Sequence, residues 1–490
     1  MPLSPDIKRA YDVLTAKSVA YTMLWRYFDG DAPMRYISDR LKTFFQSTEA
    51  RFTLNWAEVV IGAEHERLNL RQFTSANATT QERLNELFQA TELNLDATNV
   101  HLSALVTGEA FVFGWKSPTG EIEAYYNDSR LCHIFYDEEN PRKKSFAAKW
   151  WVGTDEHRYL NLYYADRIEY YVSNSKSGDV SSAEAFKPVE ALPSAPNPFG
   201  VIPIFHFRTE RRVIKSRLQN VIEPQDAINN LFGDMMIVAF VGAFRQRWIV
   251  TSADIKALKS APNENWKIPA GDGVGEDTKV GEFDVTDLTN YLNAMDSLAS
   301  KIAVITRTPK HYFFSQGGDP SGEALIAMEA PLNKKATGAI NHFKPTWVEV
   351  GAFLLQLDGI EVSKSDITPD FEQPETVQPR TAAEIREINT RAGMGLRSSL
   401  RREGWTDAEL DQLDAEPLDK VAAAKLAAEI LKDRVPLSVL LEVFAPAFGW
   451  DEAQITKIAD EAAAAADEQA RRESRAVTEA LLGVSNDETP

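Results

Sequence analysis

The sequence predicts an α+β fold in which helices predominate. Apolar residues recur at helical spacing through the first hundred residues, the middle of the chain and its Ala-rich C-terminal part. Short apolar runs separated by turn residues occupy the region from about 108 to 208, which is typical of strands. With 490 residues, 44% of them hydrophobic, the chain is long enough for about three domains and a large core.

Amphipathic helices are expected before residue 108. Their apolar periodicity covers Ser4–Asp29, Leu54–Leu68, Thr79–Leu93 and Asp96–Thr107. Adjacent residues on a helix point to different faces, so the run Glu64-His65-Glu66 predicts a solvated helix surface rather than a catalytic trio.

A β-rich lobe is expected from about 108 to 208. The runs Ala110–Trp115 and Ile122–Tyr126 flank Pro118-Thr119-Gly120, which is typical of a hairpin. The later runs are joined by short connections, which favours antiparallel pairing. Pro203 lies in the last run, and a proline in a sheet is best placed on an edge strand.

The chain is organised around residues 211–357. The pattern predicts a helix over Glu223–Phe244, a polar insert, a second helix over Asp287–Thr306 and a Gly-rich loop. Thr308 precedes a proline and is therefore pushed out of the helical region, which ends the second helix. Ser321 is expected to cap the helix that follows the loop.

The second helix has an apolar repeat close to 3.5 residues, which predicts packing lengthwise against similar helices. The residues of this repeat are Leu288, Leu292, Met295, Ala299 and Ile302. Farther on, Pro369, Pro374 and Pro379 indicate a linker, and from Thr381 the chain is again helical in pattern.

Composition and motifs argue against several classes of function. A net charge of -19 argues against a protein that grips nucleic acid by its phosphates. The phosphate-binding Gly-x-x-x-x-Gly-Lys-Ser/Thr pattern is absent, and the seven histidines lack metal-ligand spacing, so we expect no enzyme, cofactor or metal. Cys132 is the only cysteine, which favours a reducing cytoplasm, and the apolar patch Met235–Phe244 is too short to cross a membrane.

Several short segments carry a family resemblance. They are Trp25–Gly30, Asn55–Leu68, Thr107–Val112, Asn197–Pro203, Glu223–Asn229, Arg247-Trp248, Thr308-Pro309 and Ser321–Leu325. In this order they resemble the portal proteins of tailed bacteriophages, in the branch similar to SPP-type siphophage portals. The resemblance covers about residues 20 to 410, and the C-terminal part departs from the pattern.

The resemblance implies a division of the chain into the parts of a portal subunit. These are a wing (1–210, helical then β-rich), a first stem helix (211–244), a clip (245–284), a second stem helix (285–307), a tunnel loop (308–320), a long helix with the wing return (321–379) and a helical crown (380–490).

A portal protein is the head-tail connector of the phage. The resemblance implies a homo-oligomeric ring, usually of twelve subunits, at one capsid vertex of the virion, assembled in the host cytoplasm. Double-stranded DNA would be packaged and ejected through this channel. The implied partners are the terminase large subunit, a head-tail adaptor, and the major capsid and scaffolding proteins, with no membrane. Two alternatives stay open: another phage head or collar protein, and a cytoplasmic α+β enzyme.

The resemblance also implies three groups of site residues. The tunnel loop would face DNA through Lys310, His311, Tyr312, Ser315, Gln316, Gly317 and Gly318. The clip would dock partners through Trp248, Lys256, Lys259, Trp266 and Lys267. The stem would pack through the repeat of the second helix.

Ring geometry agrees with a channel for a duplex. Twelve upright helices about 9–10 Å apart form a circle that leaves a bore of roughly 23–28 Å once a helix diameter is subtracted. A double helix fits with little to spare. The acidic charge of each chain would repel phosphate and permit sliding.

Overall fold

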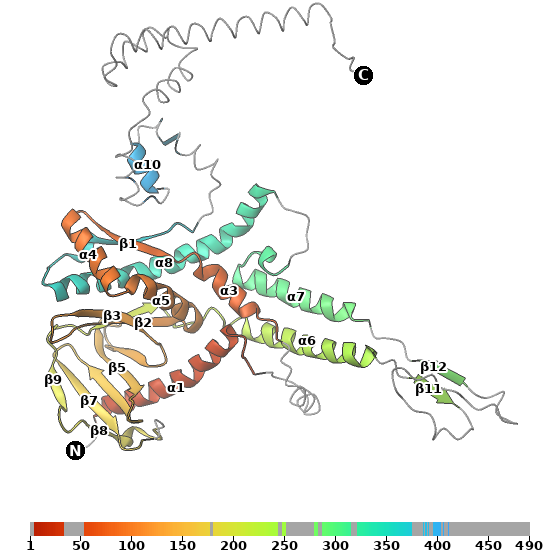
Figure 1. The fold of residues 1–490 in the computed structure, drawn as a ribbon, viewed down its shortest axis with the longest axis horizontal. Helices are drawn as coiled ribbons and strands as arrows, with labels where there is room; N and C mark the ends of the chain where they lie inside the picture. Colours follow the sequence, from red (N-terminus) through yellow and green to blue (C-terminus); the bar gives the residue numbers. More distant parts are fainter. Residues whose placement is uncertain are drawn as a thin grey trace, which may run out of the picture. The chain divides into compact units, whose positions relative to one another are not determined.

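The chain forms two compact units, Met1–Val377 and Gln378–Pro490. The computed structural model describes residues 4–33, 53–176, 180–243, 247–250, 279–282, 287–314 and 321–374, together with short stretches between 386 and 410. Figure 1 shows the elements along the chain. In the second unit the described helix is α10 (Leu396–Arg402), and most of the predicted crown lies outside the described residues.

Helices build the N-terminal part, as the periodicity predicts. They are α1 (Pro5–Phe28), α3 (Trp56–His65), α4 (Ala78–Ala90) and α5 (Leu93–Thr107). Side chains of Ser4, Asn55 and Asn77 accept hydrogen bonds from the first free amides of α1, α3 and α4. These caps explain where each helix begins.

The β-rich lobe contains two antiparallel sheets, which confirms the predicted pairing. One sheet has the order β10-β2-β3, with β2 (Glu109–Lys116), β3 (Ile122–Asn127) and β10 (Ile204–Arg208). The other has the order β4-β5-β6-β7-β8, and β9 also pairs with β7. Its strands are β4 (Cys132–Tyr136), β5 (Lys144–Val152), β6 (Arg158–Tyr163), β7 (Arg167–Ser173), β8 (Phe186–Pro188) and β9 (Ser194–Pro196), with the 3-10 turn η1 (Ala183–Ala185) before β8. Pro203 directly precedes β10, an edge strand, as expected.

A further two-stranded sheet was not predicted. β1 (Leu70–Ser75) pairs antiparallel with β13 (Ile367–Phe371), which follows the 3-10 turn η3 (Lys364–Asp366). The interpretation of Pro369 as part of a linker is therefore wrong, because Pro369 lies in β13 opposite Phe73. Both strands of a two-stranded sheet are edges, and an edge strand tolerates a residue without an N–H. The described fold is mixed α/β rather than mainly helical.

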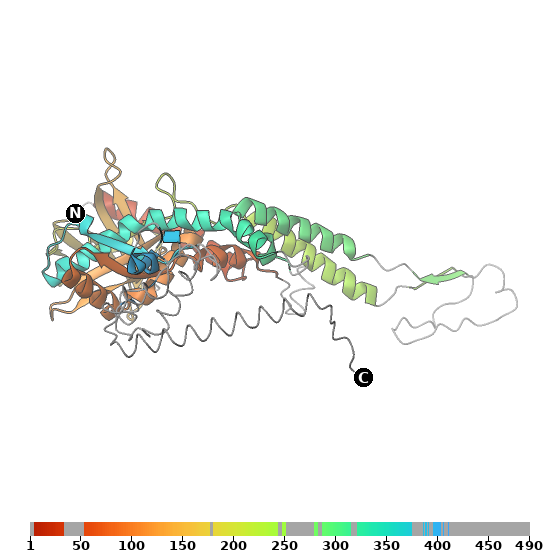
Figure 2. The same ribbon diagram turned by 90° about the horizontal axis from the view of Figure 1, so that it is seen from above.

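The middle of the chain is a pair of helices with a two-stranded antiparallel sheet between them in sequence. α6 (Ile222–Ala243) leads into β11 (Arg247–Val250), which pairs with β12 (Lys279–Glu282) before α7 (Thr289–Thr306) returns. Figures 1 and 2 show α6 and α7 side by side from two directions. The 3-10 turn η2 (Lys310–Tyr312) and the long helix α8 (Gly322–Asp358) follow.

The last part of α8 lies in the core of the first unit. Its fully buried Trp347 contacts the rings of Phe73, Phe88 and Phe207, which come from β1, α4 and β10. The start of the same helix is different, because residues 326–328 are exposed. α8 therefore joins the α/β core to the segment that follows η2.

Candidate functional site

The predicted tunnel loop begins directly after α7. The hydroxyls of Thr306 and Thr308 lie 2.9 Å apart, Pro309 follows, and residues 310–312 form the single turn η2. Lys310 and His311 are exposed, whereas Tyr312 is half-buried. The other predicted loop residues, Ser315, Gln316, Gly317 and Gly318, lie outside the described residues.

The base of this loop is packed into the protein. Phe313 is 6% exposed, and its ring centroid lies 5.2 Å from that of Trp56 at the start of α3. The amides of Phe313 and Phe314 donate to the carbonyl of Lys310. The described part of the loop is thus a fixed turn that presents Lys310 and His311 to solvent.

Arg67 ties this turn to α3 and α8. Its Nη2 donates to the Tyr312 hydroxyl at 3.1 Å, and its Nε donates to Oδ1 of Asn333 at 2.7 Å. Nη1 donates to the carbonyl of Ala63 at 2.7 Å, and Nη2 lies 3.5 Å from Oε2 of Glu329. A guanidinium has donors in a fixed planar fork, so one side chain can hold three segments in register.

Glu64 joins α3 to α8 through a second set of buried contacts. Its side chain is fully buried, with Oε1 at 3.2 Å from Arg217 and Oε2 at 2.7 Å from Lys335 of α8. Burial lowers the pKa of Lys335, although the Glu64 carboxylate opposes this. The prediction of a solvated surface at residues 64–66 is therefore wrong for Glu64, because two cations compensate its burial.

A groove of about 760 Å³ opens beside the turn, between the end of α7 and the start of α8. Its apolar lining includes Val304 and Met328, which are 69% and 39% exposed. Arg307, Lys310 and Lys334 add positive charge to the lining. Arg307 caps α7 in the left-handed region, with φ 61° and ψ 27°, where a residue with a Cβ is strained.

Three of the family-like segments, Trp25–Gly30, Asn55–Leu68 and Glu223–Asn229, contact one another. Gln225 of α6 accepts from the amide of Trp56 at 2.9 Å and donates to the carbonyl of Leu54. Asn229 accepts from the amide of Leu54 at 3.0 Å. The buried hydroxyl of Tyr27 donates to the Asp226 carboxylate, with oxygen distances of 2.8 and 2.9 Å. The polar residues of Glu223–Asn229 therefore fix the end of α1 and the start of α3 against α6.

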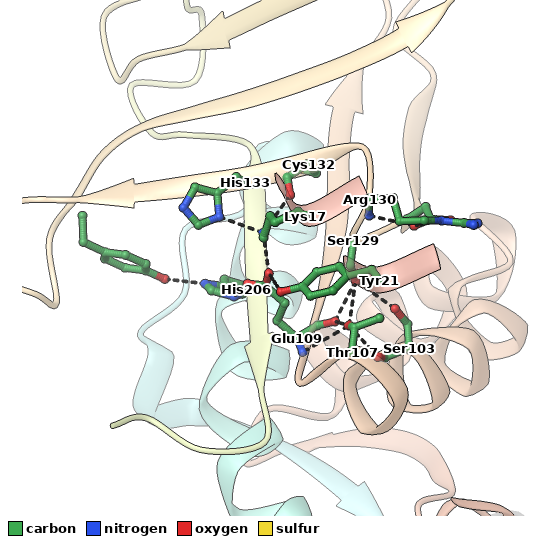
Figure 3. Close-up of polar contacts among 12 residues, drawn as sticks. Lys17, Tyr21, Ser103, Thr107, Glu109, Ser129, Arg130, Cys132, His133 and His206 are labelled. Atoms are coloured by element: carbon green, nitrogen blue, oxygen red, sulfur yellow. Dashed lines mark hydrogen bonds and ion pairs between the residues drawn. The ribbon is translucent and has the colours of Figure 1, made fainter. Parts of the chain in front are cut away.

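In the segment Thr107–Val112, Gly108 allows a close backbone approach and Glu109 accepts several buried hydrogen bonds. Gly108 has φ +96°, and a Cβ at this position would lie 2.8 Å from backbone atoms of Lys215. Glu109 is fully buried and accepts from Lys17, from the Tyr21 hydroxyl at 2.6 Å and from His206 at 2.7 Å. Figure 3 shows these donors converging on the carboxylate.

Protonation in this cluster follows from the partners. Lys17 Nζ donates to Nδ1 of His133 at 2.8 Å, so that nitrogen carries no proton. Burial, then the neighbouring Lys17 ammonium, lowers the pKa of His133 to about 3. Burial alone would raise the pKa of Glu109, but Lys17 and His206 outweigh it and the pKa is lowered. The cluster holds α1 against the β-rich lobe. The buried charge of Glu109 is balanced by Lys17, and the carboxylate accepts from Lys17, Tyr21 and His206 inside the protein.

The predicted stem residues divide between core and surface. Met295, Ala299 and Ile302 are buried in the core of their own chain, Leu288 is half-buried, and Leu292 is 48% exposed. Other apolar residues of the helix pair are more exposed, with Phe240 at 56% and Ile305 at 52%. Packing of the stem against neighbouring subunits stays a prediction.

One predicted clip residue is described. Trp248 of β11 is 37% exposed, and a Cβ on Gly281 in the facing strand would lie 2.5 Å from its ring. The close approach of the indole thus requires a glycine at this position. Lys256, Lys259, Trp266 and Lys267 lie outside the described residues.

Comparison with known proteins decides the family. The sequence model of the family described as "Phage portal protein, SPP1 Gp6-like" matches residues 16–416. The chain belongs to this portal family. The resemblance inferred from the short segments is therefore confirmed, and the match includes the Glu223–Asn229 and Thr107–Val112 segments.

Individual portal proteins are similar over a shorter stretch. The portal protein of Mycobacterium phage D29 is 31% identical over 100 residues, and that of Mycobacterium phage L5 is 30% identical over 100 residues. The matched stretch spans 20% of this chain and 20% of each relative. The portal family is structural rather than catalytic.

The described residues add two observations on other site classes. No helix among them is both long enough and apolar enough to cross a membrane. No group of three His, Cys, Asp or Glu side chains among them is placed to hold a metal ion. Sequence reasoning gave Arg67 no role of its own and placed Glu64 on a solvated surface, although both lie inside the family-like segment Asn55–Leu68.

Proposed function

We propose that this portal-family chain forms a ring of about twelve subunits at one capsid vertex and that double-stranded DNA enters and leaves the capsid through it. In this proposal α6 and α7 are the stem, residues 245–284 are the clip, residues 308–320 are the tunnel loop, residues 380–490 are the crown, and the α/β core with the wing return forms the wing. The observation that carries the proposal is the exposed pair Lys310 and His311 on a turn fixed by Arg67 at the end of α7.

Local charge supports contact with DNA at this turn. The chain as a whole carries -19, yet Lys310 is exposed on this turn and has no carboxylate at ion-pair distance among the described residues. An acidic ring with positive charge confined to one level would contact phosphate there and repel it elsewhere, which favours sliding over tight binding.

Exposed apolar side chains on the helix pair support assembly. Phe240, Leu292 and Ile305 are each about half exposed or more. Apolar surface of this kind on neighbouring helices is typical of a contact with another protein. In a ring these side chains would be covered by adjacent subunits.

The two-stranded sheet β11–β12 supports a docking role for the clip. It presents Trp248 and Val250, which are 37% and 59% exposed, on a two-stranded ribbon at the end of the helix pair. We assign to it the terminase large subunit during packaging and the head-tail adaptor afterwards. Capsid and scaffolding proteins would contact the ring from the wing.

The deciding experiment separates DNA contact from assembly. Lys310→Ala/His311→Ala should reduce packaged DNA in virions while rings of the purified protein stay intact by electron microscopy. Asp366→Ala/Lys364→Ala, in the exposed turn η3, is the matched control and should package normally. Loss of rings in the loop variant, or normal packaging by it, would refute the DNA-facing assignment.

A further inference from the structure

The groove beside η2 has the character of a binding surface. Its walls are apolar, with Val304 and Met328 well exposed, and its volume of about 760 Å³ lies in the range of functional pockets. Within the part of the chain that the structure describes, Arg307, Lys310 and Lys334 have no carboxylate at ion-pair distance. A ligand for this groove must therefore combine apolar contact with negative charge.

The chain itself carries such a surface at the start of α3 and α6. Glu58 and Glu223 are exposed in the first turns of these helices, next to half-buried Leu54, Val59 and Ile222. α6 contains no lysine or arginine, and its Asp226 is buried against Tyr27, so Glu58 and Glu223 give this surface its charge. The surface is thus complementary to the groove in charge and has apolar neighbours of its own.

Both surfaces lie at one level of the helix pair. Gln225 of α6 bonds to Trp56 of α3, and Trp56 packs on Phe313, which follows the end of α7. Figure 1 shows the end of α7 and the start of α6 at the same end of the helix pair, the end next to α3. Rotation about a ring axis keeps height unchanged, so a head-to-tail contact can join only surfaces at equal height.

We propose that the groove of one subunit receives the acidic first turns of α3 and α6 from the next copy of this chain. The inference rests on the proposed ring and names the contact between its subunits. Arg307 and Lys334 pair with Glu58 and Glu223 across the interface, and Val304 and Met328 are covered there. This contact gives the strained backbone of Arg307 a role, because its left-handed conformation places the guanidinium in the lining of the groove.

Two charge-reversed variants test the contact. The groove variant is Arg307→Glu/Lys334→Glu, and the face variant is Glu58→Lys/Glu223→Lys. In a ring of either variant alone, charges of the same sign face each other across every subunit contact. Ring assembly should therefore need a protein concentration at least about tenfold higher than that of the wild type. A one-to-one mixture restores opposite charges at both kinds of interface, and rings should return with the variants in equal number.

Native mass spectrometry reads out ring size and composition together. Arg142→Glu/Lys143→Glu, in an exposed turn of the β-rich lobe, is the matched control and should assemble like the wild type. Arg307→Gly keeps the left-handed backbone without strain, so it should fold at least as stably as the wild type yet assemble less well. This variant keeps the test decisive if a reversed variant does not fold.

The outcomes separate this inference from the proposed function. Normal assembly of both reversed variants, or a mixture that stays unassembled while wild-type rings form, overturns the contact and leaves the ring standing. A wild-type chain that never forms rings, alone or in particles, overturns both. Recovery only in the mixture supports the contact.

Discussion

Trp347 of α8 donates its indole N–H to Nε2 of His101 in α5, at 2.9 Å. Nδ1 of the same imidazole lies 2.7 Å from the carbonyl of Leu68, so Nδ1 carries the single proton. His101 is fully buried, and burial lowers its pKa to about 3. One neutral histidine therefore joins α5, α8 and the chain before β1.

Acid should destabilise the fold through His101 and His133. Both have a folded-state pKa of about 3 against 6.5 for the free side chain, so the unfolded state binds more protons between these values. The contribution of the two histidines to the free energy of unfolding is fully present above pH 6.5. It falls as the pH drops, by up to about 1.4 kcal/mol per pH unit for each histidine. Denaturant unfolding at pH 7.5, 6.5 and 5 measures the slope. His311→Gln, which keeps both buried histidines, should show the same slope, and a flat profile would contradict the assignment.

Loss of the Arg67 fork should loosen the turn at η2. Lysine cannot bond to Tyr312, Asn333 and Ala63 together, so Arg67→Lys should lower the free energy of unfolding by about 2 kcal/mol. Hydrogen exchange at the amides of residues 312–314 should speed up. Arg83→Lys, which breaks the two-pronged pair with Asp358, is the control and should leave those amides unchanged. Unchanged exchange in Arg67→Lys would show that the fork does not hold the turn.

Neutralising Glu64 should lower the free energy of unfolding far more than neutralising Glu66. Glu64→Gln leaves Arg217 and Lys335 facing one another without the carboxylate, so the free energy of unfolding should fall by about 3 kcal/mol or more. Glu66→Gln alters an exposed side chain on the same helix end and should change it by less than about 0.5 kcal/mol. Equal effects in thermal or denaturant unfolding would argue against a buried ion triad.

Two glycines with nearly the same positive φ allow backbone strain and steric clash to be separated. Gly108 and Gly120 have φ of +96° and +93°, but only a Cβ at 108 would meet backbone atoms, those of Lys215. Gly120→Ala should therefore cost only about 1–2 kcal/mol of strain, whereas Gly108→Ala should also displace the chain before α6 and reduce soluble yield. Similar melting temperatures for the two variants would contradict this account.

The helices and the first hairpin could be predicted because their signals are local. Caps such as Ser4 and Asn55, the stop at Thr308-Pro309 and the turn at Gly120 all act within a few residues. β1 and β13 were missed because each is short and its partner lies about three hundred residues away, as in the pair Leu70 and Phe371.

The candidate site was predictable in outline only. Residue types marked Lys310–Tyr312 as a loop between helices, and the structure places them on a turn at that point. Its supports depend on long-range pairs, since Arg67 and Tyr312 are 245 residues apart. Helical periodicity also cannot tell a partnered buried carboxylate from a solvated one, which is why Glu64 was misplaced.

The burial profile of α8 divides the helix into an exposed first part and a part packed in the core. Its first ten residues, about 15 Å of helix, are mostly exposed and reach the rest of the unit through the ion pairs of Glu329, and burial begins at Leu332 and Asn333. Pro331 sits where these two parts meet, and there it removes the backbone bond that would otherwise reach Ala327. We expect a load applied at Ser321 to bend the helix first at Pro331, because the second proline, Pro345, lies where α8 is packed in the core.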